Sequence, residues 1–187
     1  MKNLAIFASG TGTNSEKIIE HFKGNHKANI ALVVCNKLGA GVLAIAEKNK
    51  IPTLLIEKVR FNSPYSYLGE LTDVKIDFIV LAGFLWKMPV SIINAYPNAI
   101  VNIHPALLPK FGGKGMYGNK VHEAVIAAGE TETGITIHYV NEQYDEGAII
   151  FQATCAIEST DDAASVATKV HALEHAHFAR VVEQLIN

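Results

Sequence analysis

The sequence predicts an α/β protein with a Rossmann-like sheet of about seven twisted, mostly parallel strands, helices on both faces, and a mixed edge formed by the late strands. Three observations support this fold class. Short runs rich in β-branched residues alternate with segments of helical pattern. A glycine-containing turn follows the first run and leads into a helix. Two late runs are joined only by a short turn, which favours antiparallel pairing at that edge.

The first half of the chain consists of βα repeats. The expected strands are "NLAIFAS", "NIALVVC", "TLLI" and "DFIVLAG", and the expected helices begin near Asn14 and Gly39 and span about Tyr65 to Val74. Because each strand is short and separated from the next by a helix, the strands should be parallel.

The second half departs from this alternation. It contains a short helix from Pro89, a strand "AIVNIH", a loop and helix to Ala128, strands "GITIHYV" and "GAIIFQATC", and a closing helix from about Asp161. Only the turn "NEQYDEG" separates the last two strands. A hairpin of this kind cannot be parallel, so it predicts the mixed edge.

Composition limits the class of protein. The 187 residues suit one domain, residues 1–187, without a linker. The 16 basic and 18 acidic residues are spread along the chain, so nucleic acid is not an expected partner. The longest apolar run is about half the length that crosses a bilayer, and the start "MKN" leads into a strand rather than a signal peptide. We therefore expect a cytoplasmic protein without membrane contact, either a monomer or a homodimer.

The turn "SGTGTNSE", residues 9–16, is suited to binding an anion. Its glycines allow a tight bend, Thr13 and Glu16 have capping-box spacing, and the N–H groups at a helix start attract phosphate. Ser15 stands where a dinucleotide-binding turn has its third glycine, so NAD is not predicted. Without a P-loop lysine, the turn suits one phosphate better than three. A purely structural turn remains an open interpretation.

Asn102 and His104 end an apolar run at the carboxyl end of a predicted parallel strand. Side chains two apart share a strand face, so both should point into one pocket. Their chemistry suits addition to a carbonyl, with an amide N–H for the oxyanion and an imidazole to move a proton. Asp145 should reach His104 if the strand before it lies alongside, and would raise the pKa of the imidazole. Alternatively, these residues only cap a strand and begin a turn.

The stretch "HALEH", residues 171–175, matches an inverted zinc-protease motif. No acid lies far enough downstream to serve as the third protein ligand, so no metal site is predicted. Glu174 could instead anchor a ligand amine, with His171 near an anion. A role in helix packing is equally open for this pair.

Taken together, "SGTGTN", "VLAGF", "VNIHPALLPKF", "GITIHYV", "YDEGAIIFQ" and "LEHAHF" resemble the phosphoribosylglycinamide formyltransferase family over the whole chain. The resemblance implies a purine-biosynthesis enzyme that transfers the formyl group of its co-substrate 10-formyltetrahydrofolate to the amine of 5-phosphoribosylglycinamide. Its first half would bind phosphate, and its second half would bind folate and carry the catalytic residues. Related formyltransferases and formyltetrahydrofolate hydrolases share the N-x-H and Asp core and remain alternatives, as does a non-catalytic nucleotide-binding module.

The resemblance also implies roles for individual residues. The catalytic residues would be Asn102, His104 and Asp145, and phosphoribosylglycinamide would contact Gly12, Thr13, Asn14, His171 and Glu174. The folate would contact Leu85, Trp86, Lys87, Met88, Asn141, Glu142, Gln143 and Tyr144, largely through backbone groups. A mobile flap at residues 111–118 would close over both ligands, and no metal would be required.

In the implied mechanism, Asn102 and a protonated His104 stabilise the oxyanion, while Asp145 supports the imidazolium and helps relay the proton. Pro64, Trp86 and Ala99 stand where many family members carry a basic residue, which leaves open how the folate tail is held. A second domain of the methionyl-tRNA formyltransferase kind is not expected in a chain of this length.

Overall fold

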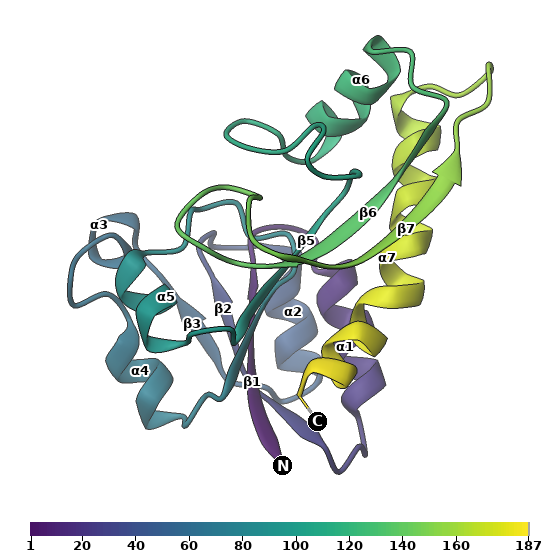
Figure 1. The fold of residues 1–187 in the computed structure, drawn as a ribbon. Coiled ribbons are helices and arrows are strands. Elements are labelled where there is room, and N and C mark those ends of the chain that lie inside the picture. The colour runs from purple at the N-terminus through teal and green to yellow at the C-terminus, as the bar shows by residue number, and fades with distance from the viewer. Residues whose placement is uncertain (187) are drawn as a thin grey trace.

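One twisted sheet contains all the strands in residues 1–186, the part of the chain that the computed structural model describes (Figure 1). Its strand order is β3-β2-β1-β4-β5-β6-β7. The strands span Lys2–Ala8, Ala28–Cys35, Thr53–Leu55, Phe78–Leu81, Ile100–His104, Glu132–Tyr139 and Ile149–Ala156, from β1 to β7. β1 to β5 pair in parallel, whereas β6 runs antiparallel to β5 and β7 antiparallel to β6. The predicted fold class, including the mixed edge, is confirmed.

Helices cover both faces of the sheet (Figure 1). α1 (Thr13–Phe22), α2 (Gly41–Lys48) and α7 (Ala163–Leu185) pack on one face, and α3 (Lys58–Phe61), α4 (Leu68–Asp73) and α5 (Val90–Ala95) pack on the other. α6 (Asn119–Ala127) lies against α7, beyond the end of the central strands. The helices therefore leave the carboxyl ends of the central strands open to a ligand.

The central strands are buried on both sides, which explains their continuous apolar sequences. In β1, Leu4 and Ile6 face the α1–α2–α7 layer, while Ala5 and Phe7 face the α3–α4–α5 layer. All four residues of β4 are buried. Burial of this kind holds the backbone rigid where the strands end, so the residues that follow start from fixed positions.

The strand order reverses direction between β1 and β4, because β2 and β3 lie on one side of β1, and β4 and β5 on the other. Ligands of open α/β sheets bind at such a switch point. Ser9 connects the two loops there: its N–H donates to the Gly83 carbonyl at 3.1 Å, and its Oγ accepts from the Leu85 N–H at 3.0 Å. The loops after β1 and β4 are thus joined directly.

The predicted capping box at Thr13 and Glu16 is wrong. Gly12 is the N-cap of α1, and no side chain caps this end. The Gly12 carbonyl already accepts from the Glu16 N–H at 2.8 Å, which makes Thr13 the first helical residue rather than the cap. The cap position has a left-handed backbone with φ of 84°, which favours glycine.

Replacing Gly12 with alanine is expected to destabilise the protein by about 1–3 kcal/mol. The left-handed backbone is strained for alanine, and its Cβ would lie 2.8 Å from the Cα of Val42, a backbone atom. Thermal unfolding measures the loss, and Gly24→Ala is the matched control. Gly24 also has positive φ, but a Cβ there meets nothing within 4 Å. Equal losses in the two variants would contradict the proposed contact.

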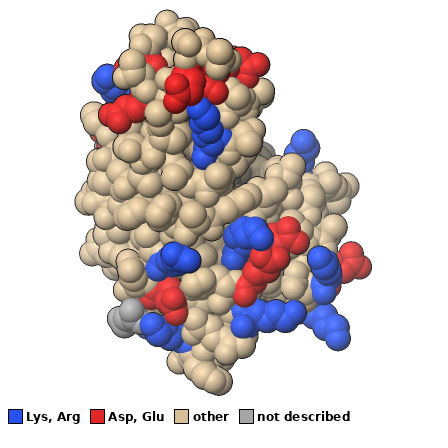
Figure 2. Space-filling model, turned by 90° about the vertical axis from the view of Figure 1, so that its right-hand side faces the viewer, with Lys and Arg blue, Asp and Glu red and all other residues tan. Residues whose placement is uncertain are grey.

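Acidic and basic side chains lie close to one another on the face drawn in Figure 2. Ion pairs among the described residues include Lys169–Asp161 and Lys27–Glu183. No helix within residues 1–186 is both long and apolar enough to cross a membrane. In the same range, no group of three or more His, Cys, Asp and Glu side chains is arranged to hold a metal ion.

Candidate active site

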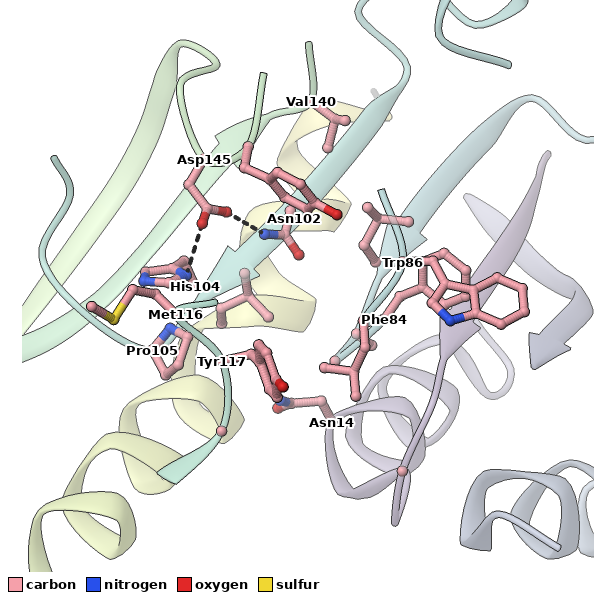
Figure 3. A pocket seen from close by; sticks show the side chains of 18 of the residues that line it. Asn14, Phe84, Trp86, Asn102, His104, Pro105, Met116, Tyr117, Val140 and Asp145 are labelled. Atoms are coloured by element: carbon pink, nitrogen blue, oxygen red, sulfur yellow. Dashed lines mark hydrogen bonds and ion pairs between the residues drawn. The ribbon is translucent and has the colours of Figure 1, made fainter. Parts of the chain in front are cut away.

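A cavity of about 600 Å³ opens at the carboxyl ends of β1, β4 and β5, over the switch point (Figure 3). Residues 10–14, 81–88 and 102–105 form its floor, and α7 contributes His171 and Glu174. Residues 113–119 and the loop between β6 and β7 complete the wall. One cavity therefore joins the glycine turn, the end of β5 and the loop that carries Asp145.

Nearly all of the predicted ligand-binding and catalytic residues line this cavity. They are Gly12, Thr13, Asn14, Leu85, Trp86, Lys87, Met88, Asn102, His104, Asn141, Gln143, Tyr144, Asp145, His171 and Glu174. Glu142 is the predicted folate contact that does not line it; its side chain is exposed in the β6–β7 loop. Residues 113–118 of the predicted flap also line the cavity.

Asn102, His104 and Asp145 converge in the cavity (Figure 3). β6 lies beside β5, so the loop after β6 brings Asp145 back over the end of β5. The backbone of Asp145 is left-handed, with φ of 57°. Its Oδ2 lies 3.5 Å from His104 Nδ1, and its Oδ1 lies 3.5 Å from Asn102 Nδ2. Nδ1 is thus the imidazole nitrogen that faces the carboxylate.

The other nitrogen of His104 is held by the start of the flap. Its Nε2 lies 2.7 Å from the Phe111 carbonyl, an acceptor, so Nε2 carries a hydrogen and donates it. In a neutral imidazole the basic lone pair is then on Nδ1. The 3.5 Å separation from Asp145 exceeds an ordinary hydrogen bond, and the carboxylate is itself an acceptor, so the Nδ1 lone pair is free to accept from a substrate group.

Asp145 raises the pKa of His104 as expected, but this effect does not decide the net shift. Burial lowers the pKa of His104 below its ordinary value of 6.5, and the charge of Asp145 and the Phe111 carbonyl only partly oppose this. Burial alone would raise the pKa of Asp145, but its contacts with the imidazoles of His138 and His104 and with the Gly113 N–H reverse that effect and lower it. Near neutral pH, the resting site therefore holds a neutral imidazole beside a carboxylate.

His138 is a site residue that sequence reasoning missed. It stands opposite Asn102 in the β5–β6 pairing, and its Nε2 lies 3.1 Å from Asn102 Nδ2. Its Nδ1 lies 2.8 Å from the Tyr139 carbonyl, so the hydrogen is on Nδ1 and Nε2 accepts from Asn102. The Asn102 amide N–H groups thus point toward His138 and Asp145. This leaves Oδ1 as the Asn102 atom facing the cavity (Figure 3).

Replacing His138 with phenylalanine is expected to lower kcat by about tenfold, because the Asn102 amide loses the partner that fixes its orientation. The KM of either substrate should change little, since His138 acts through Asn102. His138→Gln retains an acceptor and should recover part of the loss. Steady-state kinetics checks this. A phenylalanine variant with unchanged kcat, or one in which only KM rises, would contradict a positioning role.

Backbone groups at the start of the flap also hold Asp145. The Gly113 N–H donates to Asp145 Oδ2 at 2.9 Å, two residues after the Phe111 carbonyl that binds His104. Thr136 stabilises the preceding loop: its Oγ1 donates to the Ala106 carbonyl at 2.7 Å and accepts from the Leu108 N–H at 3.0 Å. The same short segment therefore contacts both members of the His104–Asp145 pair.

The glycine turn forms one end of the cavity. Among residues 1–186, no backbone acceptor receives the N–H groups of Thr13, Asn14 and Ser15, the first turn of α1. Such N–H groups, with the helix dipole behind them, form an anion site. Next to this turn, Glu174 is buried and its Oε2 accepts from Asn14 Nδ2 at 2.9 Å and His171 Nδ1 at 2.7 Å. The hydrogen bond to Glu174 raises the pKa of His171, which favours a cation beside the turn.

The opposite end of the cavity is aromatic. Phe84 and Trp86 have ring centroids 6.2 Å apart, and both pack on Phe61. Lys87 Nζ lies 5.7 Å from the centre of the Tyr144 ring. Trp86, at one of the positions where the sequence departs from the family, therefore forms part of the apolar wall. Pro64, at another, is exposed and outside the cavity lining.

Some of the backbone groups expected to bind folate are already occupied. The Leu85 N–H donates to Ser9 Oγ at 3.0 Å, and the Gln143 N–H donates to Asn141 Oδ1 at 3.0 Å. Sequence reasoning also missed Phe84, Val140 and His122, which line the cavity. Phe84 directly precedes the predicted folate segment, and this position next to the segment could have identified it as a lining residue. Nothing in the sequence distinguished His122 from other helical histidines.

The fold and the cavity define an enzyme-like α/β protein of the Rossmann-like class, with its site at the switch point. Residues 2–182 match the model of the formyl transferase family. Phosphoribosylglycinamide formyltransferase of Bacillus subtilis is 35% identical over all of this chain and 95% of that protein. The chain belongs to the formyl transferase family.

Other relatives are consistent with this membership. The chloroplastic phosphoribosylglycinamide formyltransferase of Arabidopsis thaliana is 41% identical over 97% of this chain; the chain spans 64% of its length. It similarly spans 61% of the length of the Vigna unguiculata relative, at 42% identity over 98% of this chain. The crystal structure of phosphoribosylglycinamide formyltransferase from Bacillus halodurans has a TM-score of 0.90 and 37% identity, and covers 100% of this chain and 96% of that one.

Proposed function

We propose that this protein transfers the formyl group of 10-formyltetrahydrofolate to the amine of 5-phosphoribosylglycinamide, as the names of its relatives suggest. One observation carries the proposal: a single cavity joins the anion-binding turn after β1 to the group formed by Asn102, His104 and Asp145. Formyl transfer to a substrate that carries both a phosphate and an amine needs the anion-binding turn as well as the catalytic group. The phosphate must be held while the amine reaches the formyl carbon. A hydrolase would not need the anion site.

The phosphate of the acceptor would bind the N–H groups of Thr13 and Asn14, with the His171 imidazolium supplying charge. Glu174 lies between Asn14 and His171, and its second oxygen, Oε1, has no donor among residues 1–186. This oxygen would accept an N–H or O–H of phosphoribosylglycinamide, the amine among them. The acceptor would thus extend from the turn toward His104.

The folate would lie at the aromatic end, along residues 85–88 and the loop 141–144. Phe84, Trp86 and Val140 offer apolar surface to a flat ring system, which is the fit expected of this co-substrate. Lys87 lines the cavity beside Tyr144 and would carry the positive charge for a glutamate tail that Pro64 and Trp86 do not supply.

Asn102 and His104 would direct the attack of the amine on the formyl carbon. The cavity-facing Oδ1 of Asn102 accepts an amine N–H and so aligns the nitrogen. Its Nδ2 lies 3.5 Å from the Asp145 carboxylate, a weak contact, so the hydrogen on that side would be shared with the formyl oxygen as negative charge develops there.

His104 would move the proton. As the new C–N bond forms, neutral Nδ1 accepts the proton released by the amine, and the imidazolium is then stabilised by Asp145 and the Phe111 carbonyl, both acceptors. The imidazolium next gives this proton to N10 of the folate as the C–N10 bond breaks. The amine loses one proton and N10 gains one, so the transfer is balanced without a covalent enzyme intermediate. His104 thus begins the reaction neutral in this scheme and is protonated only during it.

An absorbance assay tests the proposal with purified protein, a stable 10-formyl folate analogue, and phosphoribosylglycinamide present or omitted. We expect deformylation of the folate only when the ribonucleotide is present. Turnover that does not depend on the ribonucleotide would indicate a hydrolase instead. Absence of turnover under both conditions would favour a binding module.

A further inference from the structure

The imidazole of His122 has no role in the chemistry described so far, although it lines the cavity. It lies on α6 and is only 2% exposed. Its Nδ1 is cut off from solvent and has no hydrogen-bond partner among residues 1–186. Nε2 is not cut off in this way, so it is the ring nitrogen that reaches the cavity. A buried polar side chain without a protein partner calls for an explanation, and a ligand in the cavity supplies one for Nε2.

The surroundings of His122 identify the end of the cavity that it serves. The charged groups that influence it are His171, Glu174 and His104, and α6 packs on α7, which carries the first two. His122 is therefore close enough to feel the charges of both His104, in the reacting centre, and the His171–Glu174 pair beside the phosphate turn. Lys87, the charged residue at the aromatic end, is not among the groups that influence His122.

The protonation state follows from burial. Burial, reinforced by the charge of His171, lowers the pKa of His122, so the ring is neutral near pH 7. A neutral imidazole has one N–H and one lone pair. A buried N–H without a partner is rarer in proteins than a buried acceptor without one, so the hydrogen belongs on Nε2. The cavity thus receives an uncharged N–H donor from α6.

We propose that His122 is a substrate-binding residue, whose Nε2–H donates a hydrogen bond to an oxygen of the phosphoribosyl group. The inference rests on the proposed function, because it places the phosphoribosyl group between the turn after β1 and His104. Through His122, α6 would help to select a formyl-accepting substrate that carries a phosphorylated ribosyl group. Asn14, His171 and Glu174 come from α1 and α7, so His122 is a contact from a third helix.

Two substitutions at His122 distinguish the effect of losing the N–H donor from the effect of losing the volume of the ring. His122→Leu removes the donor, and His122→Gln keeps an N–H near the position of Nε2. We expect the leucine variant to raise the KM for phosphoribosylglycinamide about five- to tenfold and to leave the KM for the folate unchanged, with glutamine between wild type and leucine. His177→Leu is the matched control, because this histidine packs on Phe151 outside the cavity lining. An unchanged acceptor KM, or equal increases in both KM values, would overturn the assignment.

Binding without turnover distinguishes this inference from the proposed function. Calorimetry with ribose 5-phosphate should give weaker binding to His122→Leu than to wild type, whereas inorganic phosphate should bind both proteins equally. If wild type transfers no formyl group but this difference is found, the proposed function fails and His122 remains a ribosyl contact. Equal binding of ribose 5-phosphate to both folded proteins, judged by cooperative thermal unfolding, would refute the role of His122.

Discussion

Replacing His104 with alanine is expected to lower kcat for formyl transfer by about a hundredfold or more, because the imidazole that carries the proton from the amine to N10 is lost. The cavity would still bind both substrates through the turn after β1 and the aromatic wall, so KM should change much less than kcat. Single-turnover kinetics with a stable formyl donor checks the chemical step directly. The side chain is only 4% exposed, and its loss leaves the Phe111 carbonyl without its donor, so some loss of stability is also expected.

The control for this variant is His26→Ala, because His26 is exposed and outside the cavity lining. Thermal unfolding of both variants shows whether the alanine protein is still folded at the assay temperature. A folded His104→Ala variant that retains full kcat would remove His104 from the mechanism. A loss confined to KM would instead assign it to binding.

Replacing Asp145 with asparagine is expected to lower kcat by about a hundredfold and to move the acid limb of kcat/KM to lower pH. His104 accepts a proton only when neutral, and its pKa lies below 6.5, so the wild-type limb should also lie below pH 6.5. The charge of Asp145 raises that pKa against burial. Without this charge, the imidazole stays neutral to a lower pH, but the imidazolium formed during reaction is less stable.

The direction in which the acid limb of kcat/KM moves tests the effect of Asp145 on the pKa of His104. The glycinamide amine titrates identically in both assays, so a difference between the two limbs reports the protein. Glu146→Gln is the matched control, since it removes the neighbouring carboxylate, which is exposed and does not line the cavity. A limb that moves to higher pH in Asp145→Asn, or does not move, would show that Asp145 does not act on His104 as described.

Several features of the fold could be predicted because burial leaves a direct signature in sequence. The run "FIVL" of β4 is apolar throughout because both of its faces are covered. Helix ends were less predictable, because backbone hydrogen bonds decide them. The helix expected from Tyr65 begins only at Leu68, after Ser66 adopts positive φ, and α1 begins at Thr13 because Gly12 is its cap.

The site was partly predictable for a similar reason. Asn102 and His104 interrupt an apolar strand, and the two-residue period puts them on one face. His138 also lies in a strand, but its role depends on the β5–β6 register, which pairs it with Asn102 and which no local pattern reveals. The neutral state of His104 depends on how fully distant segments bury it, so a carboxylate seen in the sequence indicated the wrong net shift of its pKa.

The flap reaches the catalytic pair through its main chain, by the Phe111 carbonyl and the Gly113 N–H. Side chains are disfavoured at Gly112 and Gly113, since a Cβ at Gly112 would lie 2.5 Å from Leu108 and 3.3 Å from Asp145, and Gly113 has a left-handed backbone with φ of 91°. Variation at Lys114, Met116 and Tyr117 can therefore alter which ligands the pocket accepts while the proton-transfer apparatus stays intact, which makes this segment a natural starting point for changing substrate preference.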